Sequence, residues 1–380
     1  MRHSVSPRPS LPKLHGNPIP RRSFFHLASG IGAGVLSGVW LGGCSRKSPA
    51  PGGSGSLVAT LRGRRVGISS PHQVEILHEL YEDMKREARK PEHELEVVVV
   101  DAANDAVKQL GDIESFIAQG YDAIFFLALP SPALEGLVAQ AKVKGIPMFN
   151  HGASPVTGAT QNIVLDQRLS GTEVGRFAGR WIQEFHGGQA EVGILGNSQD
   201  PWLQMRTQGL KDGLRETAPA AKIVGEVHGH SIELGASAAA NLLQAHPGIK
   251  VMLAHADDPG FGCYTAAKEA GRINASQFLV ASCDGTRLVM DKVAEGGIYQ
   301  ATWSYLFPLS ATAAMRDIIH ALRAEPVAPT RVQVGRLVTR ATLEEVRAIT
   351  RDPQSPEVQK LYQDPSVMRY SQEPLVTPRM

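Results

Sequence analysis

Apolar runs and amphipathic segments alternate along most of this chain. Val97 to Val100 are β-branched with no polar alternation, which predicts a strand covered on both faces. In the segment that follows, apolar residues recur at three- and four-residue spacing, as on one face of a helix, at Val107, Leu110, Ile113 and Ile117. A second apolar run covers 123–129. Two buried strands joined by a helix form a right-handed βαβ unit, which predicts a parallel sheet.

The same alternation continues through the rest of the chain. It predicts strands over 65–69, 146–150, 162–165, 190–195, 223–227, 251–254, 278–282 and 299–303, with helices between them. A helix over 309–324 and one extended segment over 332–338 follow. Roughly ten strands in two successive runs exceed one sheet of ordinary size, so we expect two similar α/β lobes.

Polar residues follow the two strands of the first βαβ unit. Asp101, Asn104 and Asp105 come after the first strand, and Ser131 comes after the second. Open α/β sheets bind ligands beyond the carboxyl ends of their strands. The pattern therefore predicts a ligand site at this edge of the sheet.

Charge is distributed unevenly along the 380 residues. The first 43 residues hold five basic residues and no acidic one, whereas the remainder holds 34 basic and 37 acidic residues, a net charge of −3. A mildly acidic body gives no electrostatic reason to expect a nucleic-acid partner.

The basic first segment has the features of an export signal. Arg21 and Arg22 precede a Ser-Phe-Phe string and an apolar run over 27–41, and the run ends in LGGC. The arginine pair resembles a twin-arginine signal, and LGGC resembles the bacterial lipobox, in which Cys44 becomes the lipidated first residue. We therefore expect a removed signal over 1–43 and a lipidated flexible tether over 44–63 that attaches the protein to a membrane. The alternative is a buried apolar helix with a chance cysteine.

Two cysteines remain, Cys263 and Cys283. An oxidising compartment would permit them to pair. The geometric limits on disulfides favour two buried free thiols instead.

Several segments, taken in order, resemble the ribose- and galactose-type periplasmic sugar-binding proteins that serve ABC importers. They include DAANDAVKQLGDIESFIAQGYDAIFF, PALEGLVAQAKVKGIPMFN, VLDQRLSGTEVGRFAGRW, QMRTQGLKDGL, LLQAHPGIKVMLAHADDPGFGCYTAAKEAG and CDGTRLVMDKVAEGGIYQATW. The resemblance spans about Arg65 to Leu343 and implies two Rossmann-like lobes with parallel sheets joined by a three-strand hinge, the periplasmic binding protein type I fold. The ligand would lie between the lobes, which close around it.

The resemblance also implies where the chain crosses between the lobes: near Asp166, Tyr305 and Val338. The N-terminal lobe would comprise 64–166 and 306–337, and the C-terminal lobe 167–305 and 338–343. The remaining tail over 344–380 carries a short helix and polar, Pro-rich sequence. We expect it to be loosely packed or bound by a partner.

Seven residues are implied as ligand contacts, since sugar hydroxyls are recognised by amide, carboxylate and guanidinium groups and by aromatic rings. They are Asn104, Asn150, His151, Arg206, Asp257, Asp284 and Tyr305. Asn104, Asp257 and Asp284 would also suit helix caps. Arg206 would also suit a solvent-facing helix surface.

Three departures from the family pattern concern the ligand. The first loop, Ser69 to Gln73, lacks the aromatic pair that commonly sandwiches the sugar, Ala256 replaces an asparagine, and Tyr305 replaces a glutamine. Trp202, Trp303 and Tyr305 offer replacement ring surfaces. These departures put a classical pentose specificity in question.

No motif of a metal or catalytic site is complete. His228, His230 and His255 have metal-binding chemistry but no recognisable ligand spacing, and no G-x-S-x-G, Walker or C-x-x-C string occurs. We therefore expect no cofactor, no metal and no enzymatic activity.

The sequence predicts a monomeric, membrane-anchored receptor that delivers a sugar or polyol to an ABC permease. One alternative is a sensor module of the same fold that presents its ligand to a membrane receptor. Another is a lactose-repressor-type regulator, although the export signal stands where its DNA-binding headpiece would be. A third is an enzyme on this fold, for which no catalytic group is found.

Overall fold

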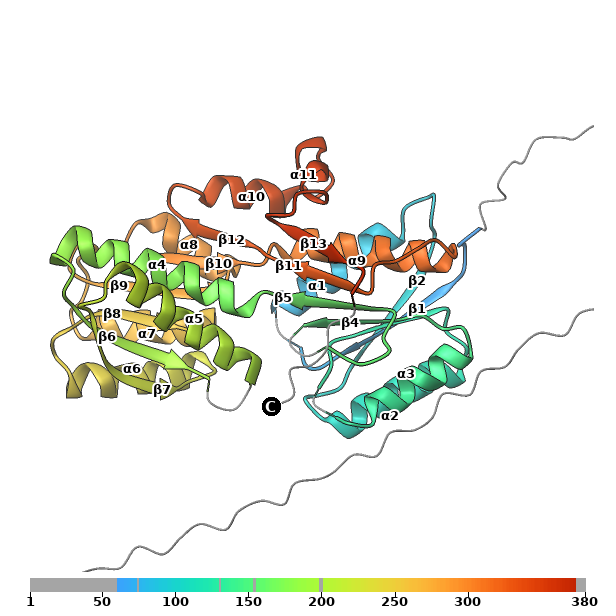
Figure 1. Cartoon of the computed structure of the whole chain (residues 1–380), viewed down its shortest axis with the longest axis horizontal. Coiled ribbons are helices and arrows are strands. Elements are labelled where there is room, and N and C mark those ends of the chain that lie inside the picture. The colour runs from blue at the N-terminus through green and yellow to red at the C-terminus, as the bar shows by residue number, and fades with distance from the viewer. Residues whose placement is uncertain (1–59, 74, 130, 153–154, 198–200, 374–380) are drawn as a thin grey trace, which may run out of the picture. The chain divides into compact units, whose positions relative to one another are not determined.

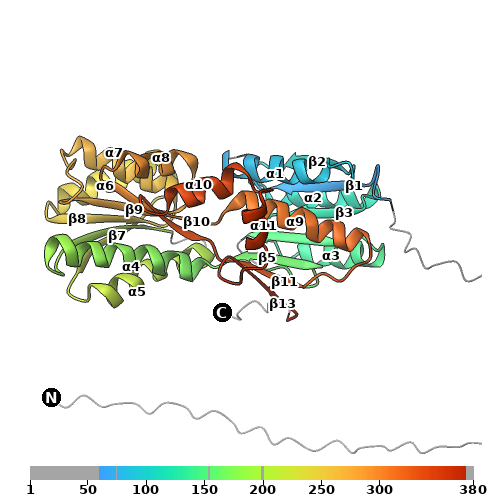
Figure 2. The same ribbon diagram turned by 90° about the horizontal axis from the view of Figure 1, so that it is seen from above.

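The computed structural model describes residues 60–73, 75–129, 131–152, 155–197 and 201–373. Two sheets form its framework (Figures 1 and 2). The first has the strand order β13-β11-β5-β4-β3-β1-β2. Its strands are β1 Arg65–Ser70, β2 Glu96–Asp101, β3 Ala123–Phe126, β4 Met148–Gly152, β5 Gln161–Leu165, β11 Thr330–Gln333 and β13 Met368–Ser371. Neighbouring strands are parallel except β13, which pairs with β11 in the antiparallel sense.

The second sheet has the order β12-β10-β9-β8-β6-β7. Its strands are β6 Glu191–Gly196, β7 Lys222–His228, β8 Ile249–Ala254, β9 Leu279–Asp284, β10 Tyr299–Ser304 and β12 Arg336–Thr339. Only β12 runs antiparallel to its neighbour, β10. The expected α/β fold with two mostly parallel sheets is confirmed.

Helices cover both faces of each sheet. They are α1 Glu75–Ala88, α2 Ala106–Ala118, α3 Leu134–Val143, α4 Gln167–His186, α5 Pro201–Thr217, α6 Ile232–Ala245, α7 Asp257–Glu269, α8 Arg287–Glu295, α9 Phe307–Leu322, α10 Leu343–Arg351 and α11 Pro356–Leu361. In β3, Phe125 packs with α1 and α9, whereas Ile124 and Phe126 pack with α2 and α3. Strand residues alternate between faces, so a continuous apolar run fills two cores.

The first βαβ unit has the predicted strand, helix and strand, but β2 is the edge strand of its sheet and Val98 is 39% exposed, so the expectation that this strand is covered on both faces is wrong. Strand β2 ends at Asp101, Asp105 caps α2 through hydrogen bonds from two backbone amides, and Gly120 follows α2 with φ +67°. The second apolar run differs, because β3 ends at Phe126 and not at Leu129.

The last crossing between the sheets differs from the sequence-based expectation. The extended segment over 332–338 is two strands: β11 lies in the first sheet and β12 in the second. Gly335 lies between them with φ +92°, and a Cβ there would stand 2.4 Å from the backbone oxygen of Ser304. The chain therefore crosses at 334–335, before Val338, at a position where only glycine fits.

The C-terminal segment is packed and not loose. Residues Leu343, Val346, Ile349, Val358, Val367 and Met368 are buried, together with Leu309 of α9 and Met290 of α8. Strand β13 extends the first sheet. A signal for this packing was present, since Leu343, Val346 and Ile349 recur at three-residue spacing on α10.

Cys263 and Cys283 are buried free thiols, as expected. Cys44 and the predicted export signal lie outside the described residues. Among the described helices, none combines the length and apolar character that crossing a membrane requires.

Candidate ligand-binding site

A buried ion pair lies at the carboxyl edge of the second sheet. Arg206, on α5, is 3% exposed, and its Nη1 donates to Asp284 Oδ1 at 2.9 Å and to the backbone oxygen of His255 at 2.6 Å. Its Nε donates to Gln167 Oε1 at 2.7 Å. The Nη2 nitrogen makes none of these bonds. Arg206 is therefore no solvent-facing helix residue, and its guanidinium is held in one orientation.

Tyr305 lies behind this guanidinium. Its hydroxyl lies 3.0 Å from Gln167 Oε1 and 2.8 Å from Ser170 Oγ and has one proton to donate to this pair, and its ring centroid is 5.3 Å from the guanidinium carbon of Arg206. The side chain is fully buried. Gln167 begins α4 directly after the chain first passes from one lobe to the other, and Tyr305 lies where it passes back. The contact between Gln167 and Tyr305 therefore links both connections between the lobes to Arg206. A direct ligand contact by Tyr305 stays a prediction, to which the burial of its side chain lends no support.

The position of Arg206 depends on close packing of α4 against α5. A Cβ at Gly171 would lie 2.0 Å from the backbone oxygen of Arg206, and one at Gly209 would lie 2.3 Å from that of Arg168. Because each helix places glycine against the other helix's backbone, the two axes approach closely. This approach brings Arg206 within reach of Gln167.

Asp284 ends β9 on a tight turn. Its φ is +132°, that of Gly285 is +73°, and a Cβ at 285 would be 2.4 Å from Ser304 Cβ. The N-cap of the following helix α8 is Thr286, so Asp284 is not that cap. Its side chain is 26% exposed. Burial raises the pKa of Asp284, while the charge of Arg206 opposes the rise.

Asp257, the first residue of α7, lies beneath this turn and is 1% exposed. Its Oδ2 accepts from Thr286 N and Oγ1, and its Oδ1 accepts from the hydroxyls of Ser282 and Thr302. Its backbone N–H donates to Asp284 Oδ2 at 3.3 Å. Ala256 is the N-cap of α7, so Asp257 does not cap it. Both carboxylate oxygens are engaged inside the lobe, and the predicted ligand contact is untested.

The first lobe holds the other three predicted contacts. Asn104 is exposed on a left-handed turn with φ +58°, and Asp105 takes the capping role that was its alternative. Asn150 is buried and donates to Asn162 Oδ1 at 2.9 Å. His151 is buried with Nε2 at 3.0 Å from Ser310 Oγ, and burial lowers its pKa to about 3. Of these three, Asn104 alone presents its side chain to solvent.

The structure thus brings Arg206, Asp257, Asp284 and Tyr305 into one hydrogen-bonded cluster of the second lobe. Sequence reasoning missed the polar residues that complete it: Gln167, Ser170, Ser282, Thr286, Tyr299 and Thr302. For Ser282 and Thr302 a signal was present, since a hydroxyl inside an otherwise apolar strand needs a buried partner. For Gln167 the only signal in the sequence was its position next to Asp166, near which the chain was predicted to cross between the lobes.

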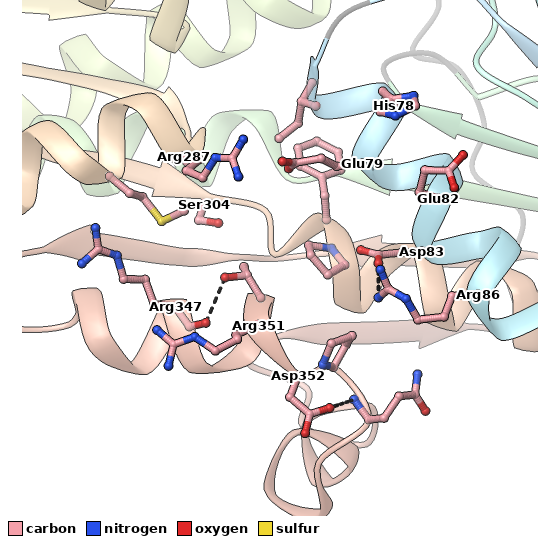
Figure 3. A pocket seen from close by; sticks show the side chains of 18 of the residues that line it. His78, Glu79, Glu82, Asp83, Arg86, Arg287, Ser304, Arg347, Arg351 and Asp352 are labelled. Carbon is pink, nitrogen blue, oxygen red and sulfur yellow. Dashed lines mark hydrogen bonds and ion pairs between the residues drawn. The ribbon is translucent and has the colours of Figure 1, made fainter.

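A cavity of about 840 Å³ adjoins the cluster at Gly285 and Ser304 (Figure 3). Helix α1 contributes acidic residues to its wall, including Glu79 and Glu82. Helices α8 and α10 contribute arginines, and Arg287 points toward Glu79 in Figure 3. None of the seven predicted contacts lines this cavity. It is a polar space of mixed charge beside the Asp284 turn.

No metal centre is evident in the described part of the chain. His228 Nε2 lies 3.2 Å from His230 Nδ1, but the described residues contain no group of three or more side chains that could hold a metal ion.

Residues 66–326 match the family model of the periplasmic binding protein domain. The chain belongs to this family. It is a family of solute-binding proteins and not of enzymes, which confirms the resemblance seen in the sequence.

Two relatives among characterised proteins illustrate the similarity. The chain is 27% identical over 254 residues to the ribose import binding protein of Bacillus subtilis, covering 65% of this chain and 78% of that protein. It is 29% identical over 203 residues to the D-ribose/D-allose-binding protein of Pseudomonas aeruginosa, covering 51% of this chain and 61% of the other.

Solved structures agree in fold. A Mycobacterium smegmatis protein in complex with β-D-fucofuranose superposes with a TM-score of 0.68 at 20% identity, covering 81% of this chain and 100% of that one. A galactofuranose-binding protein superposes with a TM-score of 0.66 at 22% identity, covering 76% and 99%. At this level of identity the superpositions establish the two-lobed architecture only.

Proposed function

We propose that this protein is an exported, lipid-anchored receptor that binds a neutral sugar or polyol between its lobes and delivers it to an ABC permease. The observation that carries the proposal is the Arg206–Asp284 pair at the carboxyl edge of the second sheet, in a chain of this family. The relatives support the class of ligand, since they include ribose-, apiose- and xylitol-binding proteins.

The chemistry of the pair suits hydroxyl groups. Asp284 offers a partly exposed acceptor, and Arg206 Nη2 carries N–H groups that the bonds to Gln167, His255 and Asp284 leave unused. A hydroxyl both donates and accepts, so one sugar oxygen can meet both groups. Because Asp284 already offsets the charge of Arg206, a neutral ligand fits better than an anion.

In this proposal, Asn104 of the first lobe contacts the ligand from the side opposite Arg206 and Asp284. Its exposed amide also donates and accepts hydrogen bonds. Contacts to both lobes are required for a ligand to favour a closed state, because a ligand shifts a conformational equilibrium only by its differential affinity. Export and lipidation at Cys44 rest on the twin-arginine and LGGC strings.

A thermal-shift screen of the full mature chain tests the ligand class. Monosaccharides, polyols and inositols are compared at several concentrations with matched sugar acids. At least one neutral compound is expected to raise the Tm in a concentration-dependent way, by the linkage between binding and stability. A flat response to every neutral compound would overturn the sugar assignment, and a response to the acids alone would show that the charge argument is wrong.

A further inference from the structure

The carboxylate of Asp257 holds the backbone turn that carries Asp284. Asp257 Oδ2 accepts from the Thr286 backbone N–H at 2.7 Å and from Thr286 Oγ1 at 2.9 Å. The amide two residues beyond Asp284 is therefore fixed directly by this carboxylate.

The other carboxylate oxygen reaches the same turn through a hydroxyl. Thr302 Oγ1 donates to Asp257 Oδ1 at 2.7 Å and accepts from the Gly285 backbone N–H at 3.2 Å. Ser282 also donates to Oδ1, and its hydroxyl lies 2.5 Å from the hydroxyl of Tyr299. The backbone amides of Gly285 and Thr286 are thus both linked to Asp257 by hydrogen bonds, Thr286 directly and Gly285 through the hydroxyl of Thr302.

The backbone conformation of the 284–286 turn depends on these hydrogen bonds. Asp284, with a Cβ, has φ +132°, a region of backbone conformation that such residues rarely occupy. Conformations of this kind persist only when the surrounding structure holds them. Gly285 adds a second positive φ of +73°. Without its ties the turn would relax and redirect the Asp284 side chain.

We propose that Asp257 is a positioning residue for ligand binding, which fixes the 284–286 turn and so aims the Asp284 carboxylate at the ligand. This inference rests on the proposed function, since Asp284 is there the ligand's acceptor. It gives Asp257 an indirect role and replaces the direct contact expected from the sequence.

Burial raises the pKa of Asp257 to about 7, and the charge of Asp284 acts in the same direction. The titratable groups around it are Arg206, Asp284, His255, Tyr299, Cys263 and Cys283. Burial raises the pKa values of Tyr299 and both thiols and lowers that of His255 to about 4. Asp257 is therefore the group of this cluster whose ionisation changes near neutral pH.

Protonation of Asp257 turns one acceptor oxygen into a donor, so one of the four groups that donate to it loses its acceptor. Ligand affinity should therefore rise as the pH increases through about 7. The stability effect has the opposite sign: a carboxyl pKa raised above its unfolded value of about 3.9 makes the free energy of unfolding fall as the pH rises from about 4 to 7.

Asp257→Asn tests the proposal in the full mature chain. The asparagine amide has the shape of the carboxylate but places an NH₂ group against one of its donors. In the ligand-free protein, the Gly285 and Thr286 amides should exchange hydrogen at least about tenfold faster, while amides inside β9 and β10 keep their rates. Affinity for a solute found in the screen should fall about tenfold, equivalent to about 1.4 kcal/mol. In this variant, ligand affinity should no longer increase as the pH rises through 7.

Thr302→Val provides a second variant if Asp257→Asn does not fold. It removes the bonds of Thr302 to Asp257 and to the Gly285 amide, keeps the direct bonds of Asp257 to Thr286, and should accelerate exchange at Gly285. Thr312→Val is the matched control: Thr312 is also buried, but its hydroxyl donates to Pro308 within α9. Unchanged exchange at 285 and 286 in the folded variants would overturn the proposal, as would an unchanged pH profile of binding in Asp257→Asn. If no solute binds the wild-type protein, the proposed function fails, and the exchange rates still decide whether Asp257 holds the turn.

Discussion

At the scale of single residues, the candidate site is a set of polar groups that fix one another before any ligand arrives. Arg206 donates hydrogen bonds to Gln167, His255 and Asp284, and the ring of Tyr305 packs against its guanidinium group. Groups held in this way lose little conformational entropy on binding. The residues that face solvent are few, and the residues that orient them are buried.

Arg206→Lys should abolish most ligand binding. Lysine keeps the charge, but it lacks the planar fork that serves Gln167, His255 and Asp284 together. Breaking a buried charge pair costs about 3–5 kcal/mol of folding stability, so the Tm should drop. Loss of a buried, hydrogen-bonded charged contact costs about 2–5 kcal/mol of binding free energy, so affinity should fall at least about thirtyfold. Titration calorimetry measures the affinity.

Arg180→Lys is the matched control, because Arg180 is an exposed arginine on the neighbouring helix α4. It should bind ligand as the wild-type protein does. Unchanged affinity in a folded Arg206→Lys variant would place the ligand elsewhere.

The chemistry of the site was predictable only in part. Asp284 and Arg206 could be nominated from strings that resemble the family, and both occupy the carboxyl edge of the second sheet. The burial of Asp257 and Tyr305 was not predictable, because it depends on hydroxyls such as Thr302 that are distant in sequence. A pattern of residue types does not show which carboxylate faces inward.

At the scale of elements, local patterns decided most of the fold. Continuous apolar runs became parallel strands, central and buried on both faces in β3 but at the edge of the sheet in β2. Three- and four-residue spacing became helices, as in α2. The missed boundary was the crossing at Gly335, where one apolar-looking stretch divides between two sheets. Periodicity carries no information about which sheet a strand joins, and the glycine was the only local sign.

Gly171→Ala tests how α4 and α5 position the site. Its Cβ would overlap the backbone oxygen of Arg206, so the two helices must separate. Overpacking of this kind costs about 1–3 kcal/mol, and alanine's better helix propensity offsets only about 1 kcal/mol. Urea unfolding should show a net loss of stability, and ligand affinity should fall because Arg206 moves away from Gln167.

Gly136→Ala is the matched control for this substitution. Gly136 lies within α3, and nothing stands within 4 Å of a Cβ built there. The same change should therefore stabilise the protein by about 0.5–1 kcal/mol and leave binding unchanged. If the two substitutions shift stability equally, close packing of α4 against α5 does not position Arg206.

At the scale of the whole molecule, the segment after β12 contacts both lobes and lies outside the family match. The match ends at residue 326, before this segment begins. Arg347 of α10 pairs with Asp291 of α8 in the second lobe, and Gln354 bonds to Glu87 of α1 in the first. Arg369 of β13 pairs with Asp166 at the first crossing. A hinge motion between the lobes must therefore accommodate contacts from this segment to both of them.

A chain that ends at Thr342 should lose the folded state or most of its stability. It lacks β13, the helices α10 and α11, and six buried apolar side chains that are each worth about 1.5–3 kcal/mol, against a typical net stability of about 5–15 kcal/mol. It also exposes Leu309 and Val338, which these side chains cover. A chain that ends at Glu373 keeps all of these contacts and serves as the control. Soluble expression and a Tm equal to that of the control would show that the segment is dispensable and support the loose tail expected from its sequence. Loss of solubility or a Tm lower by tens of degrees would show that the segment is part of the fold, so that the closure expected from the sequence would have to take place with the segment attached to both lobes.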